Sequence, residues 1–381
     1  MIYADYAATT PMSDEAIAAY TEAAKHLFGN SQSLHDAGTS SSSFLQMCRN
    51  KMATYINGEE KGVFFTSGGT ESNYLALHSI LLANKHRGNH IITTAIEHAS
   101  IHNYLYELEQ TGYEVTYLQV DEYGRISLEH LRQSITDRTI IASIQHVNSE
   151  IGTIQDIEAI GIILKENNVI FHCDCVQSFG KLPIDVKKYH IDSLSISGHK
   201  LYGPKGLGVC YINPKITWKS AFTGTTHENG FRPGTVPIPS IAALMTAVAH
   251  SIQSQEEEYI RIQQLRHYFM EQLRGLSYPI QIEEHPAYCL PHIIGVTLSH
   301  IEGQYTMLEC NRRNIMISTG SACAIGKQSP SVTMIAIGKT KEEAKTFVRL
   351  SFGKHTTEHD IDQIVEAFQH VVTIYQGVRN E

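Results

Sequence analysis

The hydrophobic positions of the chain form short apolar runs separated by longer stretches whose apolar residues share one helical face. Runs of four to seven residues are typical of strands, and stretches such as Glu71–Asn84, Ser100–Gln110 and Asp156–Asn167 are typical of helices. This alternation predicts an α/β fold with a mostly parallel sheet covered by helices. The predicted strands are Val63–Thr66, His90–Thr94, Glu114–Val120, Thr139–Gln145, Val169–Cys173, Asp192–Ser197 and Gly208–Ile212.

The pattern changes after the last predicted strand. The loop Gly224–Pro239 is followed by long helices, of which Glu256–Arg274 ends before a glycine that is suited to a C-cap. The last helix begins at a capping-box spacing, Thr357–Asp360. We therefore expect two domains, a large cofactor-binding domain of residues 14–252 and a smaller α/β domain of residues 253–381 with residues 1–13.

Composition and charge narrow the functional classes. A net charge of −9 over 381 residues gives no general basic face, so we expect no direct nucleic-acid binding. The chain start shows no signal peptide and no apolar run is long enough to span a membrane, so we expect a cytoplasmic protein. The odd number of scattered cysteines favours reduced thiols. They are Cys48, Cys173, Cys175, Cys210, Cys289, Cys310 and Cys323.

Polar residues follow several predicted strands. In parallel sheets covered by helices, ligands bind beyond the carboxyl ends of the strands. A constellation of such groups at five strand ends is a stronger indication of a cofactor site than any one of them. The residues are Gly68, Gly69 and Thr70, then His98, Asn148 and Asp174, and finally His199 and Lys200.

Two of these strand ends point to a particular cofactor. Lys200 lies in the glycine-rich turn S-G-H-K-L-Y-G-P-K-G, and a desolvated lysine there can become a nucleophile that forms a Schiff base. Taken alone, this turn fits a surface lysine better. Upstream, the apolar run V-I-F-H-C ends at Asp174. Pyridoxal 5'-phosphate requires both a Schiff-base lysine and an acidic partner for its ring nitrogen, so the pair predicts this cofactor.

The chain resembles the NifS/IscS family of cysteine desulfurases, in the class V aminotransferase group. The resemblance extends from D-Y-A-A-T-T-P at Asp5 to R-L-S-F-G-K-H-T-T at Arg349. It implies the type I fold of pyridoxal-phosphate-dependent transferases and a homodimer. It also implies conversion of L-cysteine to L-alanine, with the sulfur passed as a persulfide to an acceptor such as an iron–sulfur scaffold or a tRNA thiolase.

The resemblance assigns roles around the cofactor phosphate. A strand, a glycine turn and a helix start form an anion site, although an ordinary strand-to-helix turn looks the same in sequence. Thr235 would reach the phosphate of the partner subunit's cofactor. In this loop R-P-G-T replaces the family's usual R-S-G-T, so the resemblance does not define the loop's detailed conformation around Pro233. The phosphate in the same subunit would be held by Gly69, Thr70, Ser197 and His199.

The resemblance also assigns the ring and the substrate. His98 would lie on the pyridine ring, Asp174 would pair with the ring nitrogen, and Gln177 would bond the phenolic oxygen. Asn148 would contact both cofactor and substrate. Arg349 would bind the substrate carboxylate, because a guanidinium fits a carboxylate bidentately. Without the family, a salt bridge is the simpler interpretation of Arg349, and a helix-start histidine that bonds the backbone is the alternative for His98.

Cys323 distinguishes the reaction among pyridoxal phosphate enzymes. It lies in I-S-T-G-S-A-C-A-I-G-K-Q-S-P, whose first half resembles the S-S-G-S-A-C loop of IscS-like desulfurases and not the loop of the branch with selenocysteine lyases. The second half departs from the usual T-S-A-S-L-E-P. The resemblance implies that Lys200 removes the α-proton and that the Cys323 thiolate attacks the substrate sulfur. Transient ligation of an iron–sulfur cluster by Cys323 is compatible with this position.

Other functions remain open on the sequence alone. A lyase or aminotransferase of the same fold would use Lys200 and Asp174 without Cys323, and a non-catalytic sulfur carrier would use Cys323 only as a ligand. We expect no resident metal site. His98 and His102 lie in E-H-x-x-x-H, which is not the zinc motif H-E-x-x-H, and neighbouring residues of His172–Cys175 face opposite sides of a strand.

Overall fold

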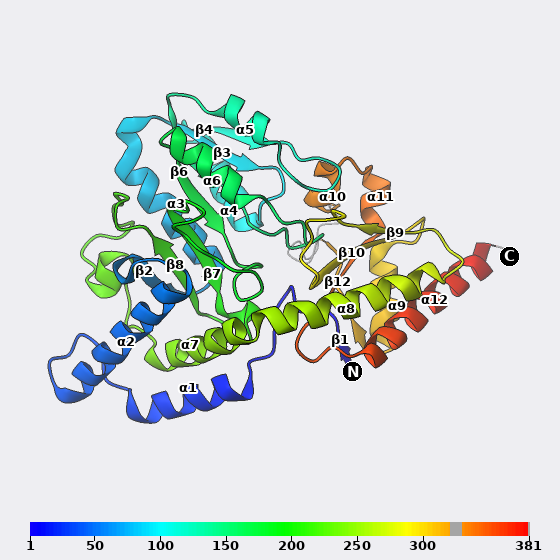
Figure 1. Cartoon of the computed structure of the whole chain (residues 1–381), viewed down its shortest axis with the longest axis horizontal. Helices are drawn as coiled ribbons and strands as arrows, with labels where there is room; N and C mark the ends of the chain where they lie inside the picture. The colour runs from blue at the N-terminus through cyan, green and yellow to red at the C-terminus, as the bar shows by residue number, and fades with distance from the viewer. Residues whose placement is uncertain (321–329, 380–381) are drawn as a thin grey trace.

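The computed structural model describes residues 1–320 and 330–379, and its centre is a seven-stranded sheet (Figure 1). The strand order is β2-β8-β7-β6-β5-β3-β4. Neighbours from β7 to β4 run parallel, whereas β8 runs antiparallel to both β2 and β7. The predicted mostly parallel sheet is therefore confirmed. The strands are β2 (Val63–Thr66), β3 (His90–Thr94), β4 (Glu114–Leu118), β5 (Thr139–Ser143), β6 (Ile170–Asp174), β7 (Ser193–Ser197) and β8 (Gly208–Ile212).

The predicted strand bounds agree for β2, β3 and β8 and differ at the ends of the others. Predicted strands that ended at Val120 and Gln145 end at Leu118 and Ser143. Val120 pairs instead with Ile126 in an isolated bridge, because the chain turns back there. Asp174 is the last residue of β6 and not the first residue after it.

Helices cover both faces of this sheet, and alternate strand residues serve the two faces. Phe65 packs in a core with Met52, Leu164 and Leu244, whereas its neighbour Phe64 packs with helices on the other face. The first face is covered by α2 (Asp36–Tyr55), α6 (Ile157–Glu166) and α7 (Ile238–Gln253), and the second by α3 (Gly69–Asn84) and α4 (Ala99–Glu109). The remaining helices of this part are α1 (Asp14–His26) and α5 (Leu128–Ser134).

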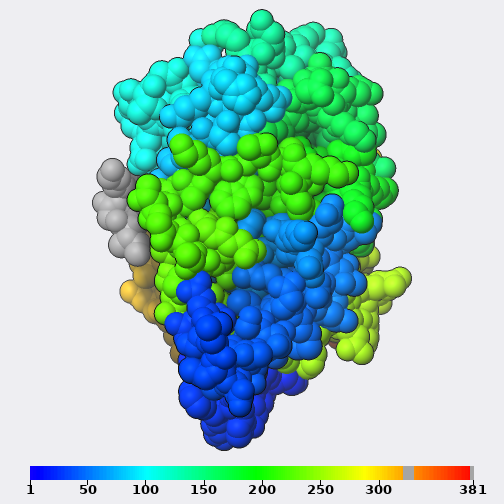
Figure 2. Space-filling view, turned by 90° about the vertical axis from the view of Figure 1, so that its left-hand side faces the viewer, coloured from blue at the N-terminus to red at the C-terminus, as the bar shows by residue number. Residues whose placement is uncertain are grey.

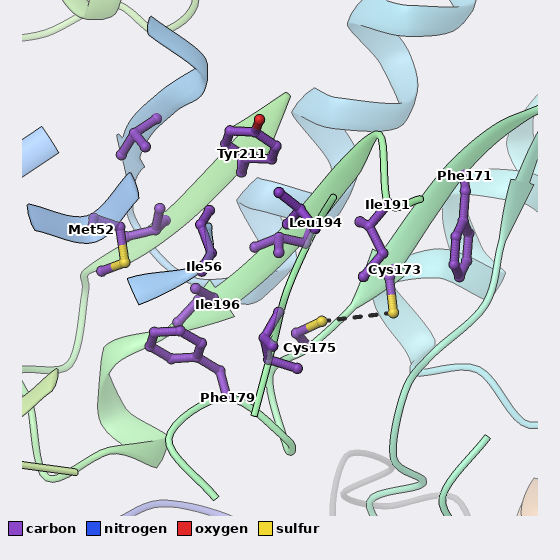
Figure 3. Close-up of a cluster of buried hydrophobic side chains, with 14 of the residues drawn as sticks. Met52, Ile56, Phe171, Cys173, Cys175, Phe179, Ile191, Leu194, Ile196 and Tyr211 are labelled. Carbon is purple, nitrogen blue, oxygen red and sulfur yellow. Dashed lines mark hydrogen bonds between the residues drawn. The ribbon is translucent and has the colours of Figure 1, made fainter. Parts of the chain in front are cut away.

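The two cysteines that flank Asp174 belong to this core. Cys173 and Cys175 are buried, and their sulfur atoms lie 3.6 Å apart among apolar side chains (Figure 3). The packing role predicted for them is confirmed. All six cysteines in the described part of the chain are free thiols.

A second, three-stranded sheet forms the other core. Its order is β12-β10-β9, and all pairs are antiparallel. Phe269, Val296, Leu350 and Phe368 pack together beside it. The elements are β9 (Ile280–Glu283), β10 (Ile293–Leu298), β12 (Phe347–Ser351), α8 (Gln255–Arg274), α9 (Gly303–Arg312), α10 (Val332–Ala336), α11 (Lys341–Lys345) and α12 (Glu358–Arg379), while β1 (Ile2–Tyr3) pairs with β11 (Ile315–Met316).

Long helices join the two cores. Figure 1 shows α7 and α8 nearly in line along the lower side of the molecule, and α8 packs against α12. The predicted capping box at the start of α12 is confirmed, since the Asp360 carboxylate accepts from Thr357 N at 2.9 Å and Thr357 Oγ1 accepts from Asp360 N at 3.2 Å. In Figure 2, α1 and α2 form the narrow lower end of one face. None of the helices in residues 1–320 and 330–379 is long and apolar enough to cross a membrane.

Candidate active site

Lys200 ends a short 3-10 turn, Gly198–Lys200, that follows β7 directly. A side chain at Gly198 would lie 3.0 Å from both Leu244 Cδ1 and the Pro204 carbonyl oxygen, so glycine lets this turn pack closely against its surroundings. The Lys200 ammonium donates to the Ala8 carbonyl at 2.7 Å and also to the Ala7 carbonyl. The N-terminal segment therefore holds the lysine at the carboxyl end of the sheet.

Asp174 and His98 are joined by a chain of hydrogen bonds. Asp174 is 7% exposed, and its carboxylate accepts from Asn73 Nδ2 at 2.8 Å and from Val176 N at 2.9 Å. Asn73 Nδ2 also donates to Ser100 Oγ at 3.0 Å, and Ser100 Oγ lies 2.9 Å from His98 Nδ1. A network of this kind fixes the orientation of both functional groups.

His98 is the N-cap of α4. Its Nδ1 accepts from Ser100 N at 3.1 Å, which is the backbone bond of the capping alternative. Because Nδ1 is an acceptor, the neutral imidazole carries its hydrogen on Nε2. The residue is exposed, so its ring can meet a ligand above the sheet.

The start of α3 forms an open anion site. Gly68 has φ +151°, and a side chain at Gly69 would come within 2.6 Å of Val176 Cγ2, so both positions require glycine. Gly68 caps the helix without a side-chain bond, and Thr70 is exposed in its first turn. Ser197 Oγ lies beside this turn, is buried, and has no hydrogen-bond partner in the described chain. Backbone N–H groups at a helix start attract anions.

His199 and Gln177 flank Lys200. Burial, with a smaller contribution from Lys200, lowers the pKa of His199 to about 4, so this imidazole is neutral at neutral pH. His199 Nδ1 lies 3.1 Å from Thr9 Oγ1. Gln177 Nε2 donates to the Ala7 carbonyl at 3.0 Å, whereas its Oε1 is buried and has no partner among residues 1–320 and 330–379.

Arg349 lies in β12 and is 6% exposed. Its Nη2 donates to Asp5 Oδ1 at 2.8 Å and its Nη1 to the Ser149 carbonyl at 3.0 Å. The salt bridge that the sequence left as the alternative is therefore present, although it is buried. Nε is buried and makes no hydrogen bond with the described residues, so this guanidinium retains one unused donor.

Asn148 is buried beside the residues that flank the Cys323 segment. Its Oδ1 accepts from Glu150 N at 2.9 Å, and its Nδ2 lies 3.3 Å from Thr333 Oγ1. The Glu150 carboxylate accepts from Ser331 Oγ and from Thr333 Oγ1. Cys323 itself lies outside the described residues.

Thr235 is exposed in the loop between β8 and α7. Two ion pairs fix this loop. Arg49 Nη2 bonds Glu228 Oε1 at 2.8 Å inside the protein, and Arg232 Nε bonds Glu71 Oε2 at 2.8 Å. Thr235 forms no hydrogen bond with the other predicted site residues in the part of the chain that the structure describes.

Sequence reasoning missed two residues of this site. Asn73 lies one helical turn after Gly69, which is the only local signal for it. Glu97 precedes His98 and is fully buried, and its Oε1 accepts from Thr94 Oγ1 at 2.7 Å and from Gln145 N at 2.9 Å. Burial raises the pKa of Glu97 to about 8. Residues 1–320 and 330–379 contain no group of three potential metal ligands.

Comparisons with known proteins define the class. The aminotransferase class-V family model matches residues 2–364. A putative cysteine desulfurase NifS from Bacillus subtilis is 48% identical over 97% of this chain and 94% of its own length, and the cysteine desulfurase IscS of Methanosarcina thermophila is 40% identical over 100% and 93%. The fold is that of a class-V aminotransferase, and the chain belongs to this class.

Solved structures agree with this. A NifS-like protein superposes with a TM-score of 0.92 at 28% identity, covering 98% of this chain and 99% of that one. SspA, solved in complex with cysteine, superposes with a TM-score of 0.82 at 32% identity, covering 94% and 100%. Within the class-V aminotransferases, the chain belongs to the NifS/IscS cysteine desulfurase family.

Proposed function

We propose that this protein binds pyridoxal 5'-phosphate and converts L-cysteine to L-alanine, with the sulfur carried away on Cys323. The observation that carries the proposal is the convergence of Asp174, Lys200 and the open helix start at Gly69 on one edge of the sheet. The relatives named as cysteine desulfurases and the SspA complex with cysteine support the choice of substrate.

The residues present fit this cofactor. The buried Ser197 Oγ and Gln177 Oε1 have no partner in the described chain, and the start of α3 at Gly68 is not capped by a side chain. Pyridoxal phosphate supplies an electron sink for negative charge at the α-carbon of a bound amino acid. Its phosphate would be held by Gly69, Thr70, Ser197, His199 and the partner's Thr235, and its ring by Asp174, Gln177, His98 and Asn148.

Lys200 both carries the cofactor and moves the proton in this proposal. The Ala7 and Ala8 carbonyls that hold its Nζ would keep the released amine close to the substrate α-carbon, from which it takes the proton. His98, with its hydrogen on Nε2, is the second group able to donate a proton there.

Arg349 binds the substrate carboxylate in this proposal. Its Nε has no hydrogen-bond partner among the described residues and can donate to a substrate carboxylate. The Asp5 carboxylate keeps the guanidinium in place. Asn148 contacts both substrate and cofactor in this proposal, and its bonds to Glu150 N and Thr333 Oγ1 hold its side chain in place. A carboxylate in this position shares the guanidinium with Asp5.

Cys323 takes the sulfur. Its thiolate forms an S–S bond to the substrate sulfur while the C–S bond breaks, and the electron pair of that bond takes a proton at the β-carbon of alanine. Described residues before and after Cys323 in the sequence bond to residues of the candidate site. Ser318 N donates to the Arg349 carbonyl at 3.0 Å, and Ser331 Oγ donates to the Glu150 carboxylate. Acceptor proteins such as an iron–sulfur scaffold or a tRNA thiolase would then receive the persulfide.

The proposal includes a cytoplasmic homodimer of two-domain subunits. The exposed Thr235, together with Phe28 and Leu34, which are 73% and 98% exposed, supports a second copy at this surface. Free thiols support a reducing compartment.

The separate cores around the two sheets support domains of residues 14–252 and of 253–381 with 1–13. Hydrogen exchange would test this division as two sets of protected amides.

The test is incubation of the purified protein with L-cysteine, with alanine, sulfide and pyruvate measured together. We expect alanine and sulfur in equal amounts, a dimer in sedimentation, and loss of both turnover and the visible cofactor absorption in Lys200→Ala. Lys205→Ala, in the same turn but exposed, is the matched control and should behave as wild type. Pyruvate and ammonia in place of alanine would favour a lyase, and an active monomer would exclude the shared site.

A further inference from the structure

A cavity separate from the candidate active site lies behind the Lys200 turn. It has a volume of about 210 Å³ and is enclosed by the N-terminal segment, the junction of α7 and α8, and the turn after Gly180. Among the residues assigned to the cofactor and the substrate, only Lys200 lines it. A space of this size holds an ion or a very small metabolite and is too small for a drug-sized ligand.

The wall of this cavity carries a half-buried ammonium, that of Lys181. The Lys181 ammonium donates to the Gln177 carbonyl at 3.1 Å and reaches the Lys200 carbonyl at 3.5 Å. Within residues 1–320 and 330–379, no carboxylate lies within ion-pair distance of Lys181. Burial, with a smaller contribution from the charge of Lys200, lowers the pKa of Lys181 to about 7. Two backbone carbonyls alone therefore compensate this ammonium poorly.

A histidine adds an unused polar group to the same wall. His292 is 6% exposed, and its Nδ1 has no hydrogen-bond partner in the described part of the chain. Burial lowers its pKa well below the usual value, and Lys181 and Arg261 add to that effect. An imidazole left unpartnered beside a cavity is available to a ligand.

The acidic residues of the cavity do not neutralise this wall. Glu258 is held by Arg261 through bonds of 2.7 and 2.8 Å. Glu257 is exposed, so it lies in water. Lys354 and His250 also line the cavity and are exposed, as Glu257 is. The Lys181 ammonium is therefore the charge on this wall that a small anion would balance.

We propose that this cavity binds a small oxyanion, held by Lys181 and His292, at a site separate from the cofactor and the substrate. A tetrahedral or carboxylate oxygen supplies the acceptors that the ammonium lacks. The inference does not depend on the desulfurase reaction, because it rests on the cavity and its charge alone.

Calorimetric titration of sodium sulfate into the protein at pH 6.5 tests this site, with cofactor bound so that the phosphate position is filled. We expect saturable binding of one sulfate per subunit, with sodium chloride at equal ionic strength as the reference. Sodium phosphate and sodium acetate titrations separate tetrahedral from carboxylate anions. Lys181→Met keeps the length of the side chain and should weaken sulfate binding at least about tenfold, since it removes the ammonium proposed to hold the anion. The exposed Lys215→Met should change nothing.

A second pair of variants leaves Lys181 in place. Ser251 lines the cavity next to Gly180, since a side chain at Gly180 would lie 3.2 Å from Ser251 Cβ. Ser251→Asp should abolish sulfate binding, because the new carboxylate takes the place of the anion, whereas the isosteric Ser251→Asn should retain it. No saturable heat in the wild type, or wild-type sulfate affinity in Lys181→Met or Ser251→Asp, would overturn the proposal. If Lys181→Met does not fold, the Ser251 pair decides.

Discussion

Replacing Asn73 by alanine should disturb both the stability and the cofactor of this protein. Asn73 is 1% exposed and lies between Asp174, Ser100 and His172. Its Nδ2 donates to the Asp174 carboxylate at 2.8 Å and to Ser100 Oγ at 3.0 Å, and its Oδ1 lies 3.1 Å from His172 Nε2. Alanine removes all three bonds and leaves buried groups without partners.

The size of the effect follows from these three bonds. A bond to a charged acceptor contributes about 1.5–3 kcal/mol and each neutral bond about 0.5–1.5 kcal/mol. We therefore expect Asn73→Ala to lose about 2.5–6 kcal/mol, or roughly 8–18 °C in Tm at about 3 °C per kcal/mol. The cofactor should also bind more weakly, because Asp174 loses the amide that orients it.

Asn84 provides the matched control in the same helix. It is 6% exposed, and its Nδ2 donates only to the backbone carbonyls of Ile80 and Thr217, at 2.8 and 3.0 Å. Asn84→Ala should lose about 1–3 kcal/mol and keep the cofactor absorption of the wild type. Thermal unfolding and visible spectra of both variants make the comparison. An Asn73→Ala variant that loses no more than Asn84→Ala, with an unchanged spectrum, would refute the reasoning.

Two other predictions concern single side chains. Arg349→Lys should raise KM for L-cysteine roughly tenfold, because an ammonium cannot bind Asp5 and a substrate carboxylate as a guanidinium does; an unchanged KM would contradict the assignment. Burial raises the pKa of Glu97 from 4.5 to about 8, so the folded protein keeps a proton that the unfolded chain releases. The free energy of unfolding of the wild type should therefore fall relative to that of Glu97→Gln as pH rises from about 4.5 to 8, by up to about 1.4 kcal/mol per pH unit. Unfolding free energies of the two proteins that change in parallel with pH would contradict this.

The sequence predicted the features that local patterns encode. Strand-like runs gave β2, β3 and β8 with the bounds that the structure shows, and the Thr357–Asp360 spacing gave the start of α12. These signals depend on residues close in the chain. The same is true of Asp174 and Lys200, each of which ends or follows a strand of the central sheet.

Features that depend on contacts between distant residues were not predictable. The bond between Asn73 and Asp174 joins α3 to β6, and the bond between Arg349 and Asp5 joins the two ends of the chain. Helix α2 was not predicted, because the polar serines in its first half interrupt the apolar periodicity that Leu45 and Met52 continue. Only the folded chain brings Lys181 and His292 to one cavity.

The most direct test of the proposed desulfurase is the reaction of Cys323→Ser with L-cysteine. Lys200, Asp174 and Arg349 are unchanged in this variant, so it should retain the cofactor absorption and bind L-cysteine. It should release no alanine above background and pass no sulfur to an acceptor, while the half-buried Cys289→Ser control stays active. Near-normal alanine release by Cys323→Ser, or a persulfide mapped in the wild type to Cys173 or Cys175, would contradict the account.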